Sequence, residues 1–299
     1  MIAPFLPMLA TSAQPFDSPD YSFEVKWDGV RALAAVAAGR WQLWGRALAD
    51  YGPRYPELDV LRRLPAGTVV DGELVVARGG LPDLQALLRR HQRVGPRRIG
   101  QASRQTPVGY VLFDLLYHQG RPLLHEPLQR RRGLLAEVLA GLQEPGLVFS
   151  EGVVGPGRDF FARLVAQGHE GVVAKHLASR YLPGQRSSAW RKVKPVRLLP
   201  CVIIGYTPAA AGFRSLLVAA ADRGGLRYVG QVRSGFTGPL RAELGRRLAR
   251  RRRPRPVVAC PRQAVWVEPE LYCQVQLLGW TAHGHLRGAS FRGVLAEGA

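Results

Sequence analysis

The sequence predicts an α+β protein in two parts: residues 1–196, in which antiparallel strands and helices are mixed, and residues 197–299, which form a small β-barrel such as an OB-fold. The first part combines strand-like and helical segments without the β-α-β repetition of a doubly wound sheet. After Pro195 and Pro200 the segments become strands separated by turns that contain Gly or Pro. About five strands and one helix in about 100 residues suit a small barrel.

The first part begins with strands. Residues 21–27 (YSFEVKW) alternate in polarity, and residues 32–46 predict two strands joined by a turn. Residues 68–77 predict another strand, bulged or broken by a turn, whereas residues 81–91 have helical spacing. The arginine-bearing segment 92–107 contains two prolines and predicts an exposed loop.

The remaining elements follow the same periodicities. In the first part the sequence predicts strands at 108–120, 170–176 and 189–195, and helices at 128–142 and 157–168, the second of which ends at Gly168. In the second part it predicts a helix at 238–251 and strands at 201–208, 214–222, 226–235, 264–281 and 286–294.

The charge balance predicts a polyanionic partner. Among the 299 residues, 42 are Lys or Arg and 22 are Asp or Glu, which gives a formal net charge of +20. So large an excess of one sign favours nucleic acid over an acidic membrane. The alternative is a general bias toward arginine with no such partner.

Cysteine usage and hydropathy predict a cytoplasmic monomer without membrane association. Cys201, Cys260 and Cys273 form no CxxC pair, so neither a zinc module nor a disulfide framework is indicated. The N-terminal stretch MIAPFLPMLA is short and broken by prolines, and no Lys or Arg precedes Lys26, unlike in a secretory signal. No apolar run reaches membrane-spanning length.

Lysine is rare in this chain. Only four of the 42 basic residues are lysines, namely Lys26, Lys175, Lys192 and Lys194. Arginine stays protonated at any accessible pH, whereas lysine can lose its proton and act as a nucleophile. All four lysines lie in short motifs rich in Asp, Glu, Gly and Trp, which favours amine or phosphate chemistry over chance retention.

These motifs resemble those of ATP-dependent DNA ligases. KWDGVR (26–31) matches the KxDGxR signature of covalent nucleotidyltransferases, and DGELV (71–75), VLFDLLY (111–117), EGVVAK (170–175) and WRKVKP (190–195) follow in family order. The ending LRGASFRGV (286–294) is similar to that of the ligase module of bacterial end-joining ligases. The resemblance implies a nucleotidyltransferase (adenylation) domain at 1–196, an OB-fold domain at 197–299, and a minimal, stand-alone ligase.

The resemblance implies that Lys26 attacks the α-phosphorus of ATP to form lysyl-AMP. A free lysine titrates near 10.4, so attack at neutral pH needs a lowered pKa, for which a bound metal ion, Lys192 and Lys194 are candidates. Glu170, with Glu73, is the expected site for Mg²⁺ or Mn²⁺, because hard cations prefer oxygen ligands.

The other matched positions receive roles in the same way. Arg31 and Arg46 resemble contacts to the ribose and to the nick 5′-phosphate, and Glu73 is an alternative ribose ligand. Phe113 would stack on adenine and Glu24 would place its amino group. The α-phosphate would be held by Lys175, Lys192 and Lys194, with pyrophosphate departure as the alternative role of Lys194. The β- and γ-phosphates would be approached by Arg287 and Arg292.

The chain departs from the family pattern at Gly45, and also at Gly288 and Ala289, where relatives often carry bulkier residues. Many relatives carry Ser before the second conserved arginine, whereas this chain has Gly45 before Arg46, which removes one possible hydroxyl contact.

The implied partner is nicked double-stranded DNA. The segment RRLARRRRPRP (246–256) holds seven arginines, and phosphate contacts are expected from Arg250, Arg251, Arg252 and Arg253. Sealing of such nicks could serve end joining or excision repair, and the sequence indicates no repair-protein partner. Two other functions stay open at this point: an RNA ligase or capping-type guanylyltransferase, and a non-catalytic nucleic-acid-binding OB protein.

Overall fold

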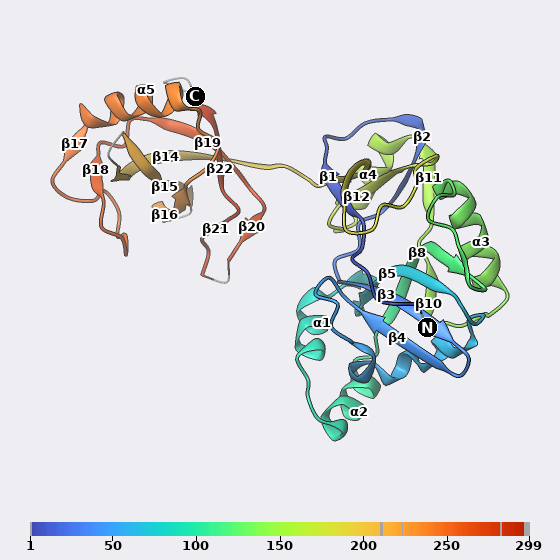
Figure 1. Cartoon of the computed structure of the whole chain (residues 1–299). Helices are drawn as coiled ribbons and strands as arrows, with labels where there is room; N and C mark the ends of the chain where they lie inside the picture. The colour runs from blue at the N-terminus through green and yellow to red at the C-terminus, as the bar shows by residue number, and fades with distance from the viewer. Residues whose placement is uncertain (1, 210–211, 223, 282, 296–299) are drawn as a thin grey trace. The chain divides into compact units, whose positions relative to one another are not determined.

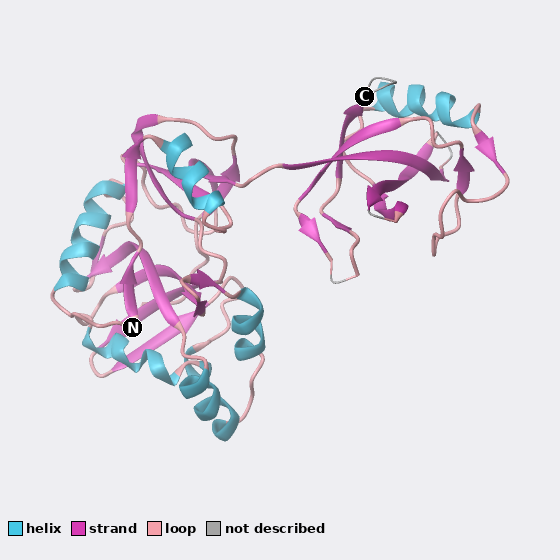
Figure 2. Ribbon diagram, turned by 180° about the vertical axis from the view of Figure 1, so that it is seen from behind, coloured by secondary structure: helices cyan, strands magenta, loops and turns pink. Residues whose placement is uncertain are grey.

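The structure, a computed structural model, describes residues 2–209, 212–222, 224–281 and 283–295. The chain divides into two compact units, Met1–Pro195 and Val196–Ala299. Each is described by itself (Figures 1 and 2).

Two sheets form the first unit. One has five strands in the order β1 (Leu9–Ser12), β13 (Arg186–Val193), β12 (Val172–His176), β2 (Ser18–Val25) and β11 (Gly152–Gly155). The other has six: β10 (Leu147–Phe149), β8 (Gly109–His118), β5 (Val69–Val75), β3 (Val30–Ala37) and β4 (Arg40–Trp44), with β9 (Arg121–Pro122) beside β8. The pairs β1–β13 and β8–β10 are parallel, and the other pairs in these two sheets are antiparallel.

Helices and short elements connect these strands: the 3₁₀ helices η1 (Gly52–Arg54) and η2 (Pro56–Arg63), the small hairpin β6 (Ala77–Arg78) and β7 (Leu81–Pro82), and the helices α1 (Leu84–His91), α2 (Pro96–Gln105), α3 (Leu128–Ala140) and α4 (Gly157–Ala166). Helix α1 begins where Asp83 accepts a hydrogen bond from the Ala86 amide at 2.8 Å, a typical N-cap. Helix α3 packs against β8 and β10 (Figure 1).

The prediction of a loop at 92–107 is wrong, because most of this segment forms helix α2. Pro96 stands at the first turn of the helix, where its missing amide hydrogen would have no partner in any case. The arginines that indicated exposure are also good helix formers, and α2 buries none of its residues. Exposure was therefore predicted correctly and secondary structure was not.

Strand β3 explains how the first unit positions a site between its layers. Alternate side chains of a strand point to opposite faces, and both faces of β3 are buried. Ala34 and Val36 join the core that contains α1, α3 and η2, whereas Leu33 and Ala35 pack with side chains that include Trp190 on β13. The six-stranded sheet thus has helices on one face and part of the five-stranded sheet on the other.

In its described residues the second unit contains a seven-stranded sheet and one helix. Its strands are β14 (Arg197–Pro208), β15 (Phe213–Asp222), β16 (Gly225–Val232), β17 (Arg252–Arg253), β18 (Val265–Val267), β19 (Tyr272–Leu277) and β22 (Ser290–Val294), and a separate hairpin is formed by β20 (Gly279–Trp280) and β21 (Leu286–Arg287). Helix α5 (Gly238–Ala249) buries Leu244 and Leu248 in the core of this unit. The strand expected at 264–281 is divided into β18, β19 and β20.

Closure of this sheet into an OB-type barrel stays a prediction. Among the described residues, a single isolated bridge between Ser234 and Ser290 joins the region after β16 to β22. Cys201 and Cys273 are buried opposite each other on β14 and β19, whereas Cys260 is half-buried; all three are free thiols. Within the described ranges no helix is both long and apolar enough to cross a membrane.

Candidate active site

A cavity in the first unit collects half of the predicted site residues. Its walls come from segments more than 160 residues apart in sequence, around β1, β2, β8, β12 and β13. Eight of the predicted side chains line it: Glu24, Lys26, Arg31, Arg46, Glu73, Phe113, Lys175 and Lys192. We call it the ATP cavity, after the nucleotide that the motifs predict.

Two close backbone approaches bring Lys26 to this cavity. Lys26 directly follows β2, and its amide donates to the Gly171 carbonyl at 2.9 Å, which ties the end of β2 to the start of β12. A Cβ atom on Gly29 would lie 2.2 Å from the Leu74 carbonyl oxygen, and one on Gly171 would lie 2.1 Å from that of Val193. Glycine is therefore needed at both positions, because no side chain fits there.

Glu170 joins two lysines from different motifs. Its carboxylate forms ion pairs with Lys26 and with Lys194, one through each oxygen. Burial raises the pKa of Glu170, but the hydrogen bonds and charges of Lys194 and Lys26 outweigh it, so the pKa lies below its usual range. Glu170 is thus a carboxylate at neutral pH that holds the Lys26 amine in place.

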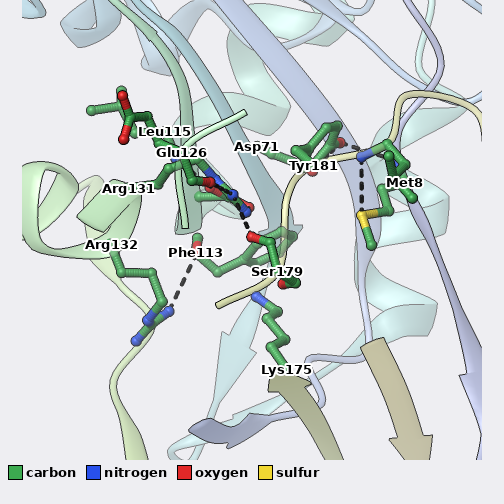
Figure 3. Close-up of polar contacts among 12 residues, drawn as sticks. Met8, Asp71, Phe113, Leu115, Glu126, Arg131, Arg132, Lys175, Ser179 and Tyr181 are labelled. Carbon is green, nitrogen blue, oxygen red and sulfur yellow. Dashed lines mark hydrogen bonds and ion pairs between the residues drawn. The ribbon is translucent and has the colours of Figure 1, made fainter. Parts of the chain in front are cut away.

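Arg31 is held by a buried network, of which Figure 3 shows Asp71, Tyr181 and Met8. It donates two hydrogen bonds of 2.6 Å to Asp71, and the Tyr181 hydroxyl donates to the same carboxylate at 2.6 Å. The Tyr181 oxygen in turn accepts from the Met8 amide at 3.0 Å. Burial lowers the pKa of Arg31, but the Asp71 carboxylate raises it by more than burial lowers it. The pKa of Arg31 therefore lies above its ordinary range. The guanidinium is therefore a fixed cation beside the cavity.

Glu24 and Lys175 form a second buried pair. The Lys175 ammonium lies 2.8 Å from Glu24 Oε2, while Arg132 on α3 lies 2.9 Å from Glu24 Oε1. Burial lowers the pKa of Lys175 to about 8, although the Glu24 charge opposes the shift. This ammonium already has a carboxylate partner, which makes it a support for Glu24 more than an open phosphate ligand.

Phe113 is enclosed by cations. The Lys175 Nζ lies 3.9 Å from the centre of its ring and the Arg31 Cζ lies 4.5 Å from it. The ring also meets Trp190 edge-on, at 6.2 Å between ring centres, and is only 6% exposed. Little of its face is open, so a stacked adenine would have to displace one of the two cations.

Two more ionisable groups line the cavity with shifted pKa values. Burial raises the pKa of Glu73 to about 7, against the opposing charges of Arg31, Lys26 and Arg46. Burial lowers the pKa of Lys192, and neighbouring cations lower it further. Among the described residues no group of three or more His, Cys, Asp or Glu side chains could hold a metal ion.

Four residues that line the cavity or hold its lining side chains were not assigned a role from the sequence. Asp71 and Trp190 stand inside the motifs DGELV and WRKVKP, and that placement was the only available signal. Tyr181 and Arg132 carry no such signal. Each acts through a partner more than 100 residues away, Asp71 for Tyr181 and Glu24 for Arg132, so only the tertiary structure reveals them.

The predicted arginines of the second unit lie on its surface. Arg292 donates to the Gln276 side chain at 2.6 Å, and Arg287 is exposed on β21.

The basic run at 250–253 is largely engaged within its own unit. Arg251 and Arg253 form ion pairs with Glu270 and Glu268 at 3.0 and 3.2 Å. Arg252 donates to the Tyr206 hydroxyl at 3.2 Å, and Arg250 is exposed at the end of α5.

Comparison with known families shows to which family a chain with these site residues belongs. Residues 1–194 match the family described as ATP dependent DNA ligase domain, and residues 209–296 match the ATP dependent DNA ligase C terminal region. The chain belongs to the ATP-dependent DNA ligase family. The resemblance drawn from the motifs and the expectation of a DNA ligase enzyme are confirmed, which disfavours the RNA ligase, capping and non-catalytic alternatives.

Similar proteins include multifunctional end-joining enzymes. The chain is 34% identical over 303 residues to the multifunctional non-homologous end joining DNA repair protein LigD of Mycobacterium tuberculosis, and 33% identical over 306 residues to LigD of Pseudomonas aeruginosa. These matches cover 96% of this chain but only 38% and 35% of the two relatives. The chain therefore spans between one third and two fifths of their length.

Solved structures give the same relationship. The chain is similar to a mycobacterial DNA ligase D complexed with ATP and MES (TM-score 0.59, 34% identity) and to the ligase domain of M. tuberculosis LigD (TM-score 0.60, 33% identity). Each match covers 97% of this chain and 95% of the other. The predicted α+β nucleotidyltransferase fold of the ligase family is thereby confirmed.

Proposed function

We propose that this chain seals nicks in duplex DNA with ATP, first forming lysyl-AMP at Lys26 and then a DNA-adenylate, and that it serves end joining. The observation that carries the proposal is the position of Lys26 in a cavity that also contains Arg31, Arg46 and Lys192. End joining is favoured over excision repair because the names of the LigD relatives state it. A cytoplasmic location, a monomeric state and separate folding of the two units as domains remain predictions.

In the first step the Lys26 amine attacks the α-phosphorus of ATP. A P–N bond forms, the bond to the pyrophosphate oxygen breaks, and the amine proton passes to solvent. The Glu170 carboxylate orients the amine, and Lys192 would face the α-phosphate from β13. Fixed cations in a partly dehydrated cavity stabilise the charge that develops in the transition state. Lys194, paired with Glu170, would follow the departing pyrophosphate.

In the later steps the phosphate at the nick takes over the adenylate. An oxygen of the 5′-phosphate attacks the α-phosphorus, and the bond to Lys26 breaks, which returns the amine. The 3′-hydroxyl then attacks the 5′-phosphorus, AMP leaves, and the strand is closed. In this scheme Arg46 is the contact to the incoming 5′-phosphate, since it lines the cavity and has no ion-pair partner among the described residues.

The nucleoside would be held by Phe113 and by the buried pair of Glu24 and Lys175. We propose that Glu24 accepts from the adenine amino group, with Lys175 and Arg132 holding the carboxylate in place. Glu73 would accept from the ribose hydroxyls. In the second unit Arg287 and Arg292 would serve the β- and γ-phosphates, and the arginines at 250–253 would contact DNA phosphates.

Two carboxylates near Lys26 are the proposed ligands of a divalent cation, which would have to replace the ammonium groups now paired with Glu170. The two oxygens of Glu170 already accept two ammonium groups, and Glu73 lies close enough to Lys26 to feel its charge. Carboxylate oxygens are the ligands that Mg²⁺ and Mn²⁺ prefer, so Glu170 and Glu73 would hold the ion. When bound, it supplies positive charge that polarises the reacting phosphate.

Incubation with α-labelled ATP or GTP and Mg²⁺ or Mn²⁺ tests the proposal. We expect label from ATP on the parent protein and none on Lys26→Arg, which keeps the charge but offers no neutral amine. Label on the Arg variant would exclude Lys26 as the nucleophile. Sealing of nicked DNA, measured beside nicked RNA, tests the substrate class separately.

A further inference from the structure

A second cavity adjoins the ATP cavity. It shares three lining side chains with it, namely Arg31, Arg46 and Glu73. The remaining lining residues are Gly29, Val30 and Tyr51. Tyr51 belongs to none of the motifs, and the functions described above do not use it. We call this space the side cavity.

The chain places Tyr51 against Gly45. After β4 the segment turns back on itself: the Leu48 amide donates to the Gly45 carbonyl at 3.0 Å, and the Tyr51 amide donates to the Leu43 carbonyl at 2.6 Å. A Cβ atom on Gly45 would lie 2.2 Å from the Tyr51 hydroxyl oxygen and 2.3 Å from its ring. Any side chain at position 45 would therefore push the tyrosine away.

Other contacts hold the ring without using its hydroxyl. The ring meets His91 edge-on, with the ring centres 4.6 Å apart, and the Arg54 guanidinium lies 5.6 Å from the ring centre. Among the described residues the hydroxyl itself has no hydrogen-bond partner. It is a donor fixed in position beside Arg46, a cation that forms no ion pair with the described residues.

We infer that the Tyr51 hydroxyl is a ligand of the DNA 5′-phosphate at the nick, and that Gly45 is glycine in order to admit it. The inference rests on the proposed function. The 5′-phosphate must come within bonding distance of the α-phosphorus carried by Lys26, from the side opposite the amine. The side cavity adjoins the ATP cavity at Arg31 and Arg46, which line both. A hydroxyl next to a guanidinium suits a phosphate, which accepts several hydrogen bonds.

The test compares nicked duplexes that carry a 5′-phosphate or a 5′-hydroxyl, bound by the full-length protein. The measured quantity is the ratio of the two dissociation constants, because general DNA affinity and partial misfolding cancel in it. A hydrogen bond to a charged group corresponds to roughly tenfold in affinity, so Tyr51→Phe is expected to lower the preference for the 5′-phosphate about tenfold. Tyr117→Phe, a half-buried tyrosine that does not line either cavity, is the matched control and keeps the parental ratio.

An unchanged ratio in Tyr51→Phe would overturn the inference. If Gly45→Ala lowers the ratio in that case, the position of the ring matters and the hydroxyl does not. Labelling of the parent protein with ATP separates this test from the proposed function: absence of label would refute adenylyl transfer, whereas label with an unchanged Tyr51→Phe ratio would refute only the tyrosine contact.

Discussion

Replacing Asp71 by Asn tests whether the network behind Arg31 holds the active site together. Asn keeps the shape of the side chain but removes the charge that accepts two hydrogen bonds from Arg31 and one from Tyr181. The amide group of Asn must also face one of these donors. The substitution thus leaves a buried guanidinium without its counter-charge.

The burial of the pair sets the size of the effect. The side chains of Arg31 and Asp71 are 14% and 0% exposed, so the small values typical of surface ion pairs do not apply. Removing one partner of a buried pair costs about 3–5 kcal/mol, and the partial exposure of Arg31 favours the lower end. Tyr181→Phe removes a hydrogen bond to a charged group, which costs about 1.5–3 kcal/mol, and also the one accepted from the Met8 amide, which adds about 1 kcal/mol.

Urea unfolding of the parent, both single variants and the double variant measures these values. We expect a loss of about 3 kcal/mol for Asp71→Asn and a double variant that loses less than the sum, because the tyrosine has already lost its acceptor. Asp59→Asn is the control: Asp59 also pairs with an arginine but is 58% exposed, and we expect a loss below about 1 kcal/mol. Equal losses for Asp71→Asn and Asp59→Asn would refute the reasoning.

Four further predictions concern other groups. The pKa of Lys175 is about 8 in the folded protein and 10.5 in the unfolded chain, so between pH 8 and 10.5 the unfolded chain binds more protons. The free energy of unfolding of the parent should therefore rise with pH in that window by up to about 1.4 kcal/mol per pH unit. Parallel plots of the free energy of unfolding against pH for the parent and Lys175→Met would exclude this. Glu170→Ala should raise the metal concentration needed for adenylylation, and an unchanged metal titration would remove it as a ligand. Arg292→Ala should impair adenylylation more than sealing of pre-adenylylated nicks; equal losses would indicate a structural role. Exchange of the arginines at 250–253 for Gln should flatten the log-log salt dependence of nick binding by about 0.9 per lost contact while adenylylation survives, and parallel slopes would contradict phosphate contacts.

The sequence by itself determined the family, the fold class and most of the residues of the ATP cavity. Short motifs such as KWDGVR carry this information locally, because the nucleophile and its turn are neighbours in sequence. The rarity of lysine pointed to the same positions without any alignment. Secondary structure was predicted well at α3, whose buried residues recur every three or four positions, and failed at α2, which has few apolar residues and buries none of them.

Only the tertiary structure decided how the charges are paired. Glu170 and Lys175 stay predicted ligands of metal and phosphate, and the fold pairs each of them with an opposite charge that lies at least 24 residues away in sequence. Pairing depends on which strands become neighbours, and strand order is not written in any single motif. The relation between Tyr51 and Gly45 also depends on the tertiary structure. From the sequence, the glycine at position 45 indicates only a lost contact. In the folded chain, the Tyr51 hydroxyl occupies the space that a Cβ atom of residue 45 would take.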